Sequence, residues 1–355
     1  MPLESFKATD FRCLEAVELE FDPAYNLVYG ANASGKTSLL EALAYLGRGK
    51  SFRGAATENL VRQGAREFVL FGRVRRGGRL QGVGVRNGPD GLEISVDGNP
   101  AGGAAALAEA LPLQVIDPDV HDLVAGGPEQ RRRYLDWVTF HVEHGYLEAW
   151  RRFRRALKQR NAALRQGAGA GALSGWDREF VETGQVLDAA RRRAFARLES
   201  GLDAASRSLV GAGVVFEYRQ GWPMDGDLSS AVAGAQERDR AQGSCQVGPQ
   251  RADLRLTFDE RRARKMVSRG QQKLLACSMI LAATEVVQET LEAPLLLLLD
   301  DPAAELDGSS LGRLMARVAG LGCQVIATSL DPETRLFPVA PRTFHVEQGH
   351  LHRTA

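Results

Sequence analysis

One eight-residue run constrains the fold of this chain more than any other feature. The run matches the pattern GxxxxGK[ST], follows the short apolar segment 26–29 and precedes leucines at helical spacing. In such a strand–loop–helix unit, backbone N–H groups and the positive helix end wrap a phosphate group. A glycine-rich turn that matches by chance is the alternative, and the flanking segments argue against it. We therefore expect an ATP-binding loop formed by Gly30, Ala31, Asn32, Ala33, Ser34, Gly35, Lys36, Thr37 and Ser38.

A second motif supplies the acidic groups that such a loop requires. Leu295–Leu299 is an aliphatic run typical of a buried parallel strand, and Asp300 and Asp301 follow it directly. Lys36 would bridge the β- and γ-phosphates, while the Thr37 hydroxyl would ligate Mg²⁺. Asp300 would hold the Mg²⁺ shell, and Asp301 would be the catalytic residue that polarises the attacking water. Adjacent acids also occur at ordinary strand ends, so this pair indicates a nucleotide site only in combination with the phosphate loop.

A third motif lies directly before a long apolar helix, predicted at about 270–291. Ser268 and Gly270 would stand at the helix N-terminus, which is a ready anion site. A serine there can equally be a plain N-cap. A phosphate loop, a distant Ser-x-Gly-Gln, a Walker B strand and then Glu305-Leu306-Asp307 is the order found in ATP-binding-cassette ATPases.

The remaining segments indicate an α/β fold with a helical insertion. Segments 17–21 and 26–29 read as strands, and segments 68–74, 80–86 and 92–97 predict an antiparallel meander. Two helical stretches, 146–165 and about 176–209, flank a glycine-rich tip and predict a projecting antiparallel arm. Later strands are expected at 214–218, 254–258, 295–299 and 325–327, and segment 220–244 has the composition of a loop.

Positive charge gathers in the helical insertion. The whole chain has 45 Lys and Arg against 44 Asp and Glu, which excludes a uniformly basic nucleic-acid binder. Segment 128–165 nevertheless concentrates arginines, which predicts a footprint for DNA phosphates with little base reading. A solvated helix face with internal ion pairs is the alternative. The predicted DNA contacts are Arg151, Arg154, Arg155 and Lys158, with a second basic cluster at Arg261, Arg262, Arg264 and Lys265.

Four further motifs occur in the order typical of one family. They are GRGKSFR at 47–53, PEQRRRYLDW at 128–137, GPQRADL at 248–254 and SRGQQKLL at 268–275. Over essentially its whole length the chain resembles the RecF family of bacterial recombinational-repair ATPases, which is related to SMC-type heads. The chain departs from the family pattern at Ala33, where glycine is usual, and at Arg269, Gln250 and Ala252.

The resemblance implies an SMC-head-like ATPase fold with an antiparallel β lobe and an inserted helical arm. It implies a homodimer in which ATP and Mg²⁺ lie between the phosphate loop of one subunit and the signature of the other, formed by Ser268, Arg269, Gly270, Gln271 and Gln272. Asp307 would lie at the same subunit boundary, Thr328 would be a switch residue, and Gln114 is a candidate for the glutamine loop.

The resemblance also implies a role in the cell. The protein would be a weak, DNA-stimulated ATPase that dimerises on gapped DNA and helps RecO and RecR to load RecA, with a part in SOS induction. The expected head spans 1–116 and 211–355, and the expected arm spans 117–210. The scattered cysteines and the absence of a signal or a long apolar run predict a cytoplasmic location. The nucleotide-binding subunit of a transporter and a P-loop kinase are the alternative functions.

Overall fold

The chain forms two compact units. In this computed structural model residues 1–354 are described, except 168, 259–260, 263–267 and 333–335. One unit comprises Met1–Val120 and Leu291–Ala355, and the other comprises His121–Thr290. This division differs from the predicted boundaries, because residues 211–290 group with the helical segment and not with the phosphate-loop unit. The assignment of 1–116 and 211–355 to an ATPase head, and of 117–210 to an arm, remains a prediction.

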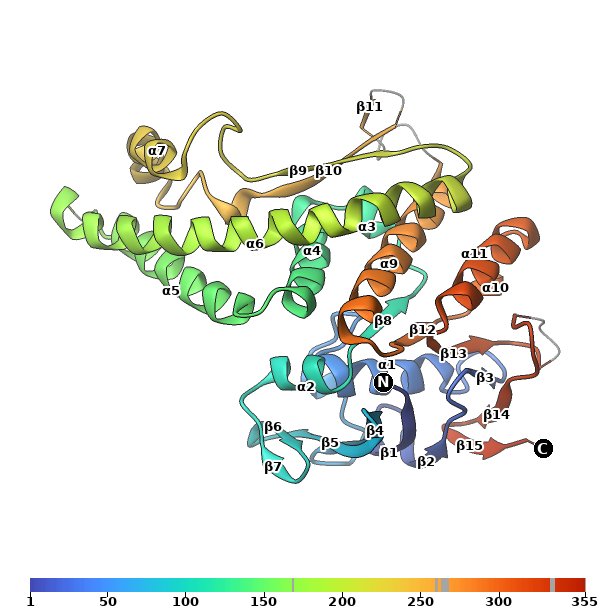
Figure 1. Cartoon of the computed structure of the whole chain (residues 1–355). Helices are drawn as coiled ribbons and strands as arrows, with labels where there is room; N and C mark the ends of the chain where they lie inside the picture. Colours follow the sequence, from blue (N-terminus) through green and yellow to red (C-terminus); the bar gives the residue numbers. More distant parts are fainter. Residues whose placement is uncertain (168, 259–260, 263–267, 333–335, 355) are drawn as a thin grey trace. The chain divides into compact units, whose positions relative to one another are not determined.

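The first unit contains a six-stranded antiparallel sheet with the order β2-β1-β4-β5-β6-β7. Its first strand, β1, and the edge strand β2 form a hairpin, and β4, β5 and β6 are the predicted meander (Figure 1). The strands are β1 (Leu3–Phe11), β2 (Leu14–Glu20), β4 (Phe68–Arg76), β5 (Arg79–Gly88), β6 (Gly91–Val96) and β7 (Asn99–Pro100).

A second six-stranded sheet in this unit carries the candidate site. Its order is β15-β14-β3-β13-β12-β8, and all neighbours are parallel except β14 and β15. The strands are β3 (Tyr25–Tyr29), β8 (Leu113–Ile116), β12 (Leu296–Leu299), β13 (Gln324–Ser329), β14 (Arg342–Glu347) and β15 (His350–Arg353). Because parallel strands end at one edge of a sheet, the loops after β3, β8, β12 and β13 meet there.

Helix α1 (Lys36–Arg48) lies between the two sheets of this unit (Figure 1). Leu39, Leu40 and Leu43 are fully buried and belong to a core that includes residues of both sheets. The helix that follows the phosphate loop is therefore fixed from both sides by burial of apolar surface. The other helices of the unit are η1 (Thr57–Asn59), α2 (Ala104–Ala110), α10 (Pro302–Glu305) and α11 (Gly308–Leu321).

The second unit contains the predicted helical hairpin. Helix α5 (Tyr146–Arg165) packs along α6 (Ala170–Val210), and the rings of Phe153 and Phe180 lie 5.2 Å apart between them. Helix α6 is unbroken at Gly184, where an added Cβ would lie only 2.8 Å from Leu228 Cδ2. The other elements are α3 (Asp122–Ala125), α4 (Pro128–Val142), α7 (Leu228–Gln242), η2 (Pro249–Arg251), β9 (Val215–Arg219), β10 (Asp253–Phe258), β11 (Arg261–Arg262) and α9 (Arg269–Leu291).

The prediction of a loop at 220–244 is wrong, because α7 occupies most of it. Asp227 begins this helix as a side-chain N-cap that accepts a hydrogen bond from Ser230 N. Leu228, Val232 and Ala235 are buried beneath it. The apolar face is narrow and surrounded by Gly, Ser and Gln, so the helical period is weak in the sequence.

Helix α9 is the one described helix long and apolar enough to cross a membrane by composition, with a mean hydropathy of 1.4. Within the fold, 72% of that apolar window is buried. Its residues Leu275, Met279 and Ala283 are completely covered. The apolar sequence is thus accounted for by a core helix.

Candidate nucleotide-binding site

The phosphate loop connects β3 to α1, as predicted, and its backbone requires glycine at two positions. Gly30 has φ 158°, and a Cβ there would lie 2.3 Å from the Val346 carbonyl oxygen. Gly35 has φ 117° and immediately precedes the helix. Ala33 also adopts a left-handed conformation, with φ 61°. The departure from the family's glycine at Ala33 therefore falls at a position where a side chain adds backbone strain.

Lys36 folds back across this loop. Its side chain is 7% exposed, and Nζ donates hydrogen bonds to Gly30 O at 2.7 Å and Ala31 O at 2.9 Å. Burial lowers the pKa of Lys36, while the nearby carboxylates of Asp301 and Asp300 oppose that shift. The ammonium group is thus held at the mouth of the loop, where a phosphate oxygen can replace a carbonyl as its acceptor.

Asp300 joins three parts of the sheet edge. Its Oδ1 accepts hydrogen bonds from Thr37 Oγ1 at 3.2 Å and from Thr328 Oγ1 at 3.0 Å. These three residues come from the end of β12, the start of α1 and the end of β13. Burial raises the pKa of Asp300, and the two hydroxyl hydrogen bonds partly offset that rise. The fold therefore brings together the predicted Walker B, phosphate-loop and switch residues.

Thr328 also positions the predicted catalytic acid. Its Oγ1 accepts a hydrogen bond from Asp301 N at 2.8 Å and at the same time donates to Asp300. Asp301 has φ 46°, a left-handed conformation that a non-glycine residue adopts only where its surroundings impose it. The buried hydroxyl of Thr328 thus fixes the turn on which Asp301 lies.

The oxygens of Thr37 and Asp300 fit a Mg²⁺ ion. Mg²⁺ prefers hard oxygen ligands and commonly takes one or two from protein, with waters and phosphate completing the shell. No group of three or more His, Cys, Asp or Glu that could hold a metal occurs within the described part of the chain. Thr37 and Asp300 would supply two of the oxygens of such a shell.

The predicted signature begins α9 in the other unit, and its local geometry is a reciprocal cap. Ser268 Oγ accepts a hydrogen bond from Gln271 N at 3.3 Å, and Gln271 Oε1 accepts one from Ser268 N at 2.9 Å. This is a capping box with glutamine at the third helical position. Ser268, Arg269, Gly270 and Gln271 are all exposed. The structure thus gives Ser268 the N-cap role, while its contact with ATP stays a prediction.

Asp307 has a comparable local role in the first unit. Its Oδ1 accepts hydrogen bonds from Ser309 N and Ser310 N, both at 3.0 Å, at the start of α11. A hydrogen bond from the Ser310 hydroxyl, together with these two backbone bonds, lowers the pKa of Asp307. The side chain is exposed. Its predicted position at a subunit boundary remains a prediction.

Asp117 was not among the predicted site residues, yet it follows β8 as Asp300 follows β12. The two strands are neighbours, and Asp300 N donates to Ile116 O at 2.9 Å. Burial, with repulsion from Asp119 and Asp300, raises the pKa of Asp117 to about 6, and Arg48 opposes the rise. Gln114 is a buried strand residue that accepts a hydrogen bond from Arg48. The detectable signal was an acid directly after the apolar run 111–116.

The arginines of segment 128–165 divide into two groups. In the first group, five side chains are bound within the second unit. Arg132 donates a hydrogen bond to Ala252 O. The other four form ion pairs, which are Arg131–Asp253, Arg133–Glu129, Arg152–Glu179 and Arg160 with Asp177 and Asp239. The predicted DNA contacts belong to the other group. Arg151, Arg155 and Lys158 are exposed and have no ion pair to a described residue, and Arg154 lies 5.0 Å over the Trp150 ring. The helix thus presents unneutralised cations along one exposed face.

The other family motifs in this unit have structural roles. The side chain of Gln250 donates a hydrogen bond to Val247 O at 2.8 Å, and Ala252 is fully buried. These two departures from the family pattern therefore lie in a packed turn. Of the second basic cluster, Arg264 and Lys265 lie outside the described residues, while Arg261 and Arg262 form β11.

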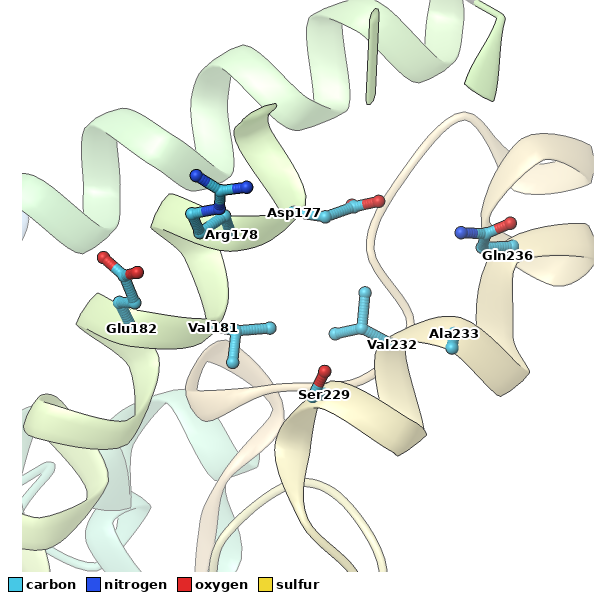
Figure 2. Close-up of a pocket in the computed structure, with 8 residues that line it drawn as sticks. All are labelled: Asp177, Arg178, Val181, Glu182, Ser229, Val232, Ala233 and Gln236. Carbon is cyan, nitrogen blue, oxygen red and sulfur yellow. The ribbon is translucent and has the colours of Figure 1, made fainter. Parts of the chain in front are cut away.

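A cavity of about 400 Å³ lies between α6 and α7, within the second unit (Figure 2). Val181, Val232 and Ala233 form its apolar part, while Arg178 and Glu182 project from α6. Asp177 is already ion-paired with Arg160. With charges of both signs and no phosphate loop, this cavity does not form part of the nucleotide site.

Comparison with known proteins places the chain in a single family. The model described as the RecF/RecN/SMC N terminal domain matches residues 2–350. The chain is 38% identical to the DNA replication and repair protein RecF of Pseudomonas fluorescens and 39% identical to that of Chromohalobacter salexigens. The first alignment covers 100% of this chain and 99% of the relative, and the second covers 99% of each.

Solved structures agree with the fold. A structure of the recombination mediator protein RecF with ATP, from the RecFOR pathway, matches with a TM-score of 0.90 at 24% identity, covering 100% of this chain and 98% of that one. An SmcHead bound to the C-winged helix domain of ScpA matches with a TM-score of 0.61 at 14% identity, covering 100% of this chain and 97% of that one. The predicted SMC-head-like α/β fold is confirmed.

Proposed function

This chain belongs to the RecF family of DNA replication and repair proteins, and we propose that it hydrolyses ATP to control its own dimerisation on DNA during recombinational repair. The observation that carries the proposal is the meeting of Thr37, Asp300 and Thr328 at one edge of a parallel sheet, beside the phosphate loop. A transporter subunit is not favoured, because the relatives that match over full length are DNA repair proteins.

Residues of the loop would bind the triphosphate of ATP. Backbone N–H groups of residues 30–37 and the N-terminus of α1 supply donors for the β-phosphate. Lys36 would exchange its carbonyl acceptors for γ-phosphate oxygens, and Thr37 with Asp300 would hold Mg²⁺. The bound Mg²⁺ supplies neutralisation of the charge that develops on the phosphates. Lys36→Ala should therefore abolish most ATP binding while the far-ultraviolet circular dichroism stays unchanged.

Asp301 would orient and polarise the attacking water. Its position rests on the left-handed turn held by Thr328, which points to a defined and not a mobile carboxylate. The asparagine of Asp301→Asn keeps the shape of the side chain, but its amide is a far poorer base than a carboxylate. The variant should bind ATP, form the dimer and lose hydrolysis. Retention of wild-type hydrolysis would remove Asp301 from the mechanism.

Ser268 would contact ATP held by a second copy of the chain. It is exposed at the start of α9, where the positive end of a helix favours an anion. Ser268→Arg should still bind ATP as a monomer, because its own phosphate loop is unchanged, but should not dimerise. Sedimentation of Ser268→Arg and Asp301→Asn with and without ATP tests the model. An ATP-dependent dimer of Ser268→Arg would contradict the sandwich.

The exposed face of α5 would bind the DNA backbone. Neutralising Arg151, Arg154 and Arg155 together to glutamine should weaken binding to unrelated duplexes about equally. The slope of log K against log salt should fall by up to about 0.9 for each DNA phosphate that the variant no longer neutralises.

A matched control for this DNA experiment removes the same charge elsewhere in the unit. Arg133, Arg193 and Arg207 are exposed and paired with Glu129, Glu143 and Asp203, respectively. Their triple glutamine variant should retain the wild-type slope. If both triple variants lower the slope equally, net charge and not the α5 face accounts for binding.

The wider role follows from family membership. We propose that the protein acts in the cytoplasm with RecO and RecR at gapped DNA to aid RecA loading and SOS induction, and that DNA stimulates a weak ATPase. Sedimentation with ATP and gapped, duplex or single-stranded DNA tests the DNA preference. A dimer that forms equally with all three, and an ATPase rate that none of them raises, would refute this part.

A further inference from the structure

A second cavity, of about 140 Å³, lies in the helical unit beside β10. We call it the Arg255 pocket. Its lining includes three guanidinium groups and one carboxylate; the residues are Val124, Arg131, Arg219, Asp253, Leu254, Arg255 and Leu256. A single water needs roughly 10–15 Å³ of such space, so the pocket is large enough to admit a small oxyanion.

The sheet register places the charged residues together. Asp253 pairs with Arg219 and Arg255 pairs with Glu217 across β10 and β9. Paired residues and residues two apart share one face of a sheet, so Arg219 and Arg255 are diagonal neighbours there. Leu254 and Leu256 alternate with them and are buried. Two guanidinium groups on separate strands are therefore within reach of one ligand.

The carboxylates near the pocket are already used. Arg131, 7% exposed, holds Asp253 through two bonds, Nε to Oδ1 at 2.8 Å and Nη2 to Oδ2 at 3.2 Å. Arg219 Nη2 lies 2.8 Å from Glu217 Oε2. Both acids therefore have a cation bound, and Arg255 has no ion pair to a residue that the structure describes.

Arg255 has a buried donor without an acceptor. Its Nε is fully covered and has no hydrogen-bond partner in the part of the chain that the structure describes. An unsatisfied buried donor on a charged group costs more free energy than one on a neutral group. Arg255 also lines the pocket, where a phosphate oxygen can accept hydrogen bonds from guanidinium N–H groups in their preferred planar geometry.

We propose that the Arg255 pocket binds a phosphate group through Arg255 and Arg219. The ligand is a single phosphate, supplied either by the DNA backbone or by free phosphate. The first source rests on the proposed DNA-binding function, whereas the second does not. The pocket would be a contact separate in sequence from the α5 face, and it would hold one phosphate at a fixed point beside the β9–β10 sheet.

The first arm of the test measures DNA binding. Arg255→Gln and Arg219→Gln should each lower the salt slope on duplex DNA by about 0.9, the value for one DNA phosphate. Arg238→Gln is the matched control, because Arg238 is an exposed arginine of α7 in the same unit. Its slope should equal the wild-type slope. Circular dichroism checks that each variant is folded, and Arg219 is the safer site because its side chain is 42% exposed.

The second arm measures free phosphate. Melting temperatures are compared in sodium phosphate and in sodium chloride of equal ionic strength, with every variant in a Lys36→Ala background to weaken the phosphate loop. If phosphate stabilises the protein, Arg255→Gln removes this stabilisation and the DNA slopes do not change, the pocket binds free phosphate. A lowered slope assigns it to DNA. If neither the slope nor the stabilisation depends on Arg255, the proposal is wrong. If the wild type binds no DNA, the proposed function fails and the phosphate arm alone decides the pocket.

Discussion

Replacing Thr328 with valine tests whether one hydroxyl organises the catalytic edge of the sheet. Valine has nearly the same shape, so the change removes two hydrogen bonds without a cavity. Asp301 N–H would lose its acceptor, which costs about 1–3 kcal/mol, and Asp300 would lose a charge-assisted bond worth about 1.5–3 kcal/mol. The extra buried methyl group returns about 0.8 kcal/mol. We expect Thr328→Val to lower the free energy of unfolding by about 2–5 kcal/mol.

The loss of stability in Thr328→Val should depend on pH, and the change in the pKa of Asp300 determines the direction of that dependence. The Thr328 hydrogen bond favours the charged carboxylate and so lowers the pKa of Asp300 against the larger effect of burial. The variant should therefore have a higher pKa for Asp300 than the wild type. A raised folded-state pKa means that stability is lost as pH rises through it. The difference between variant and wild type should be larger at about pH 8 than at about pH 5.

Urea unfolding at both pH values, in the presence of EDTA, measures this difference. Thr139→Val is the matched control, because Thr139 is fully buried and its hydroxyl donates only to the Leu135 carbonyl in its own helix. It should cost no more than about 1 kcal/mol and show no pH dependence. ATP hydrolysis should fall in Thr328→Val at saturating ATP, because the turn carrying Asp301 loosens. A loss equal to that of Thr139→Val would refute the reasoning.

Three further changes test separate parts of the site. Ala33→Gly should raise the free energy of unfolding by up to about 1 kcal/mol in urea melts, because it relieves the strain of the left-handed backbone. An unchanged free energy of unfolding would show that the greater entropy of the unfolded chain cancels this gain. Asp117→Asn should flatten the stability profile between about pH 4 and pH 7 by roughly 2–3 kcal/mol, since the folded-state pKa of about 6 makes the wild type lose stability as pH rises. An unchanged profile would show that Asp117 ionises normally. Ser268→Asp should keep the helix cap and the thermal stability but prevent the ATP-dependent dimer in sedimentation; loss of stability or retention of the dimer would each contradict one of the two roles.

The parts of the site that are contiguous in sequence were predictable, and those made by strand pairing were less so. Lys36 and Thr37 begin α1, directly after a loop whose spacing predicts phosphate binding, so the motif predicted their positions. The bond from Thr328 to Asp300 exists because β13 and β12 are adjacent, and no local pattern encodes that adjacency. Asp117 was missed for the same reason, since its importance comes from β8 pairing with β12.

The fold was predictable wherever apolar spacing was strong. The meander β4–β6 and the α5–α6 hairpin have clear periods of two and about 3.6 residues. Helix α7 was missed because few apolar residues form its buried face and Gly, Ser and Gln surround them. The grouping of 211–290 with the helical unit was also missed. It depends on β9 and β10 packing against α6 and α4, which are tertiary contacts between distant segments.

The two readings of Ser268, helix cap and ATP ligand, are chemically compatible. As a cap, its Oγ acts only as an acceptor for Gln271 N–H. A serine hydroxyl also carries one donor hydrogen, which the cap leaves unused. That hydrogen, at the positive end of a helix of 23 residues, is what a γ-phosphate oxygen requires. The cap holds the side chain in one rotamer and leaves the donor available, so the bond to Gln271 would preorganise the signature for the partner's ATP.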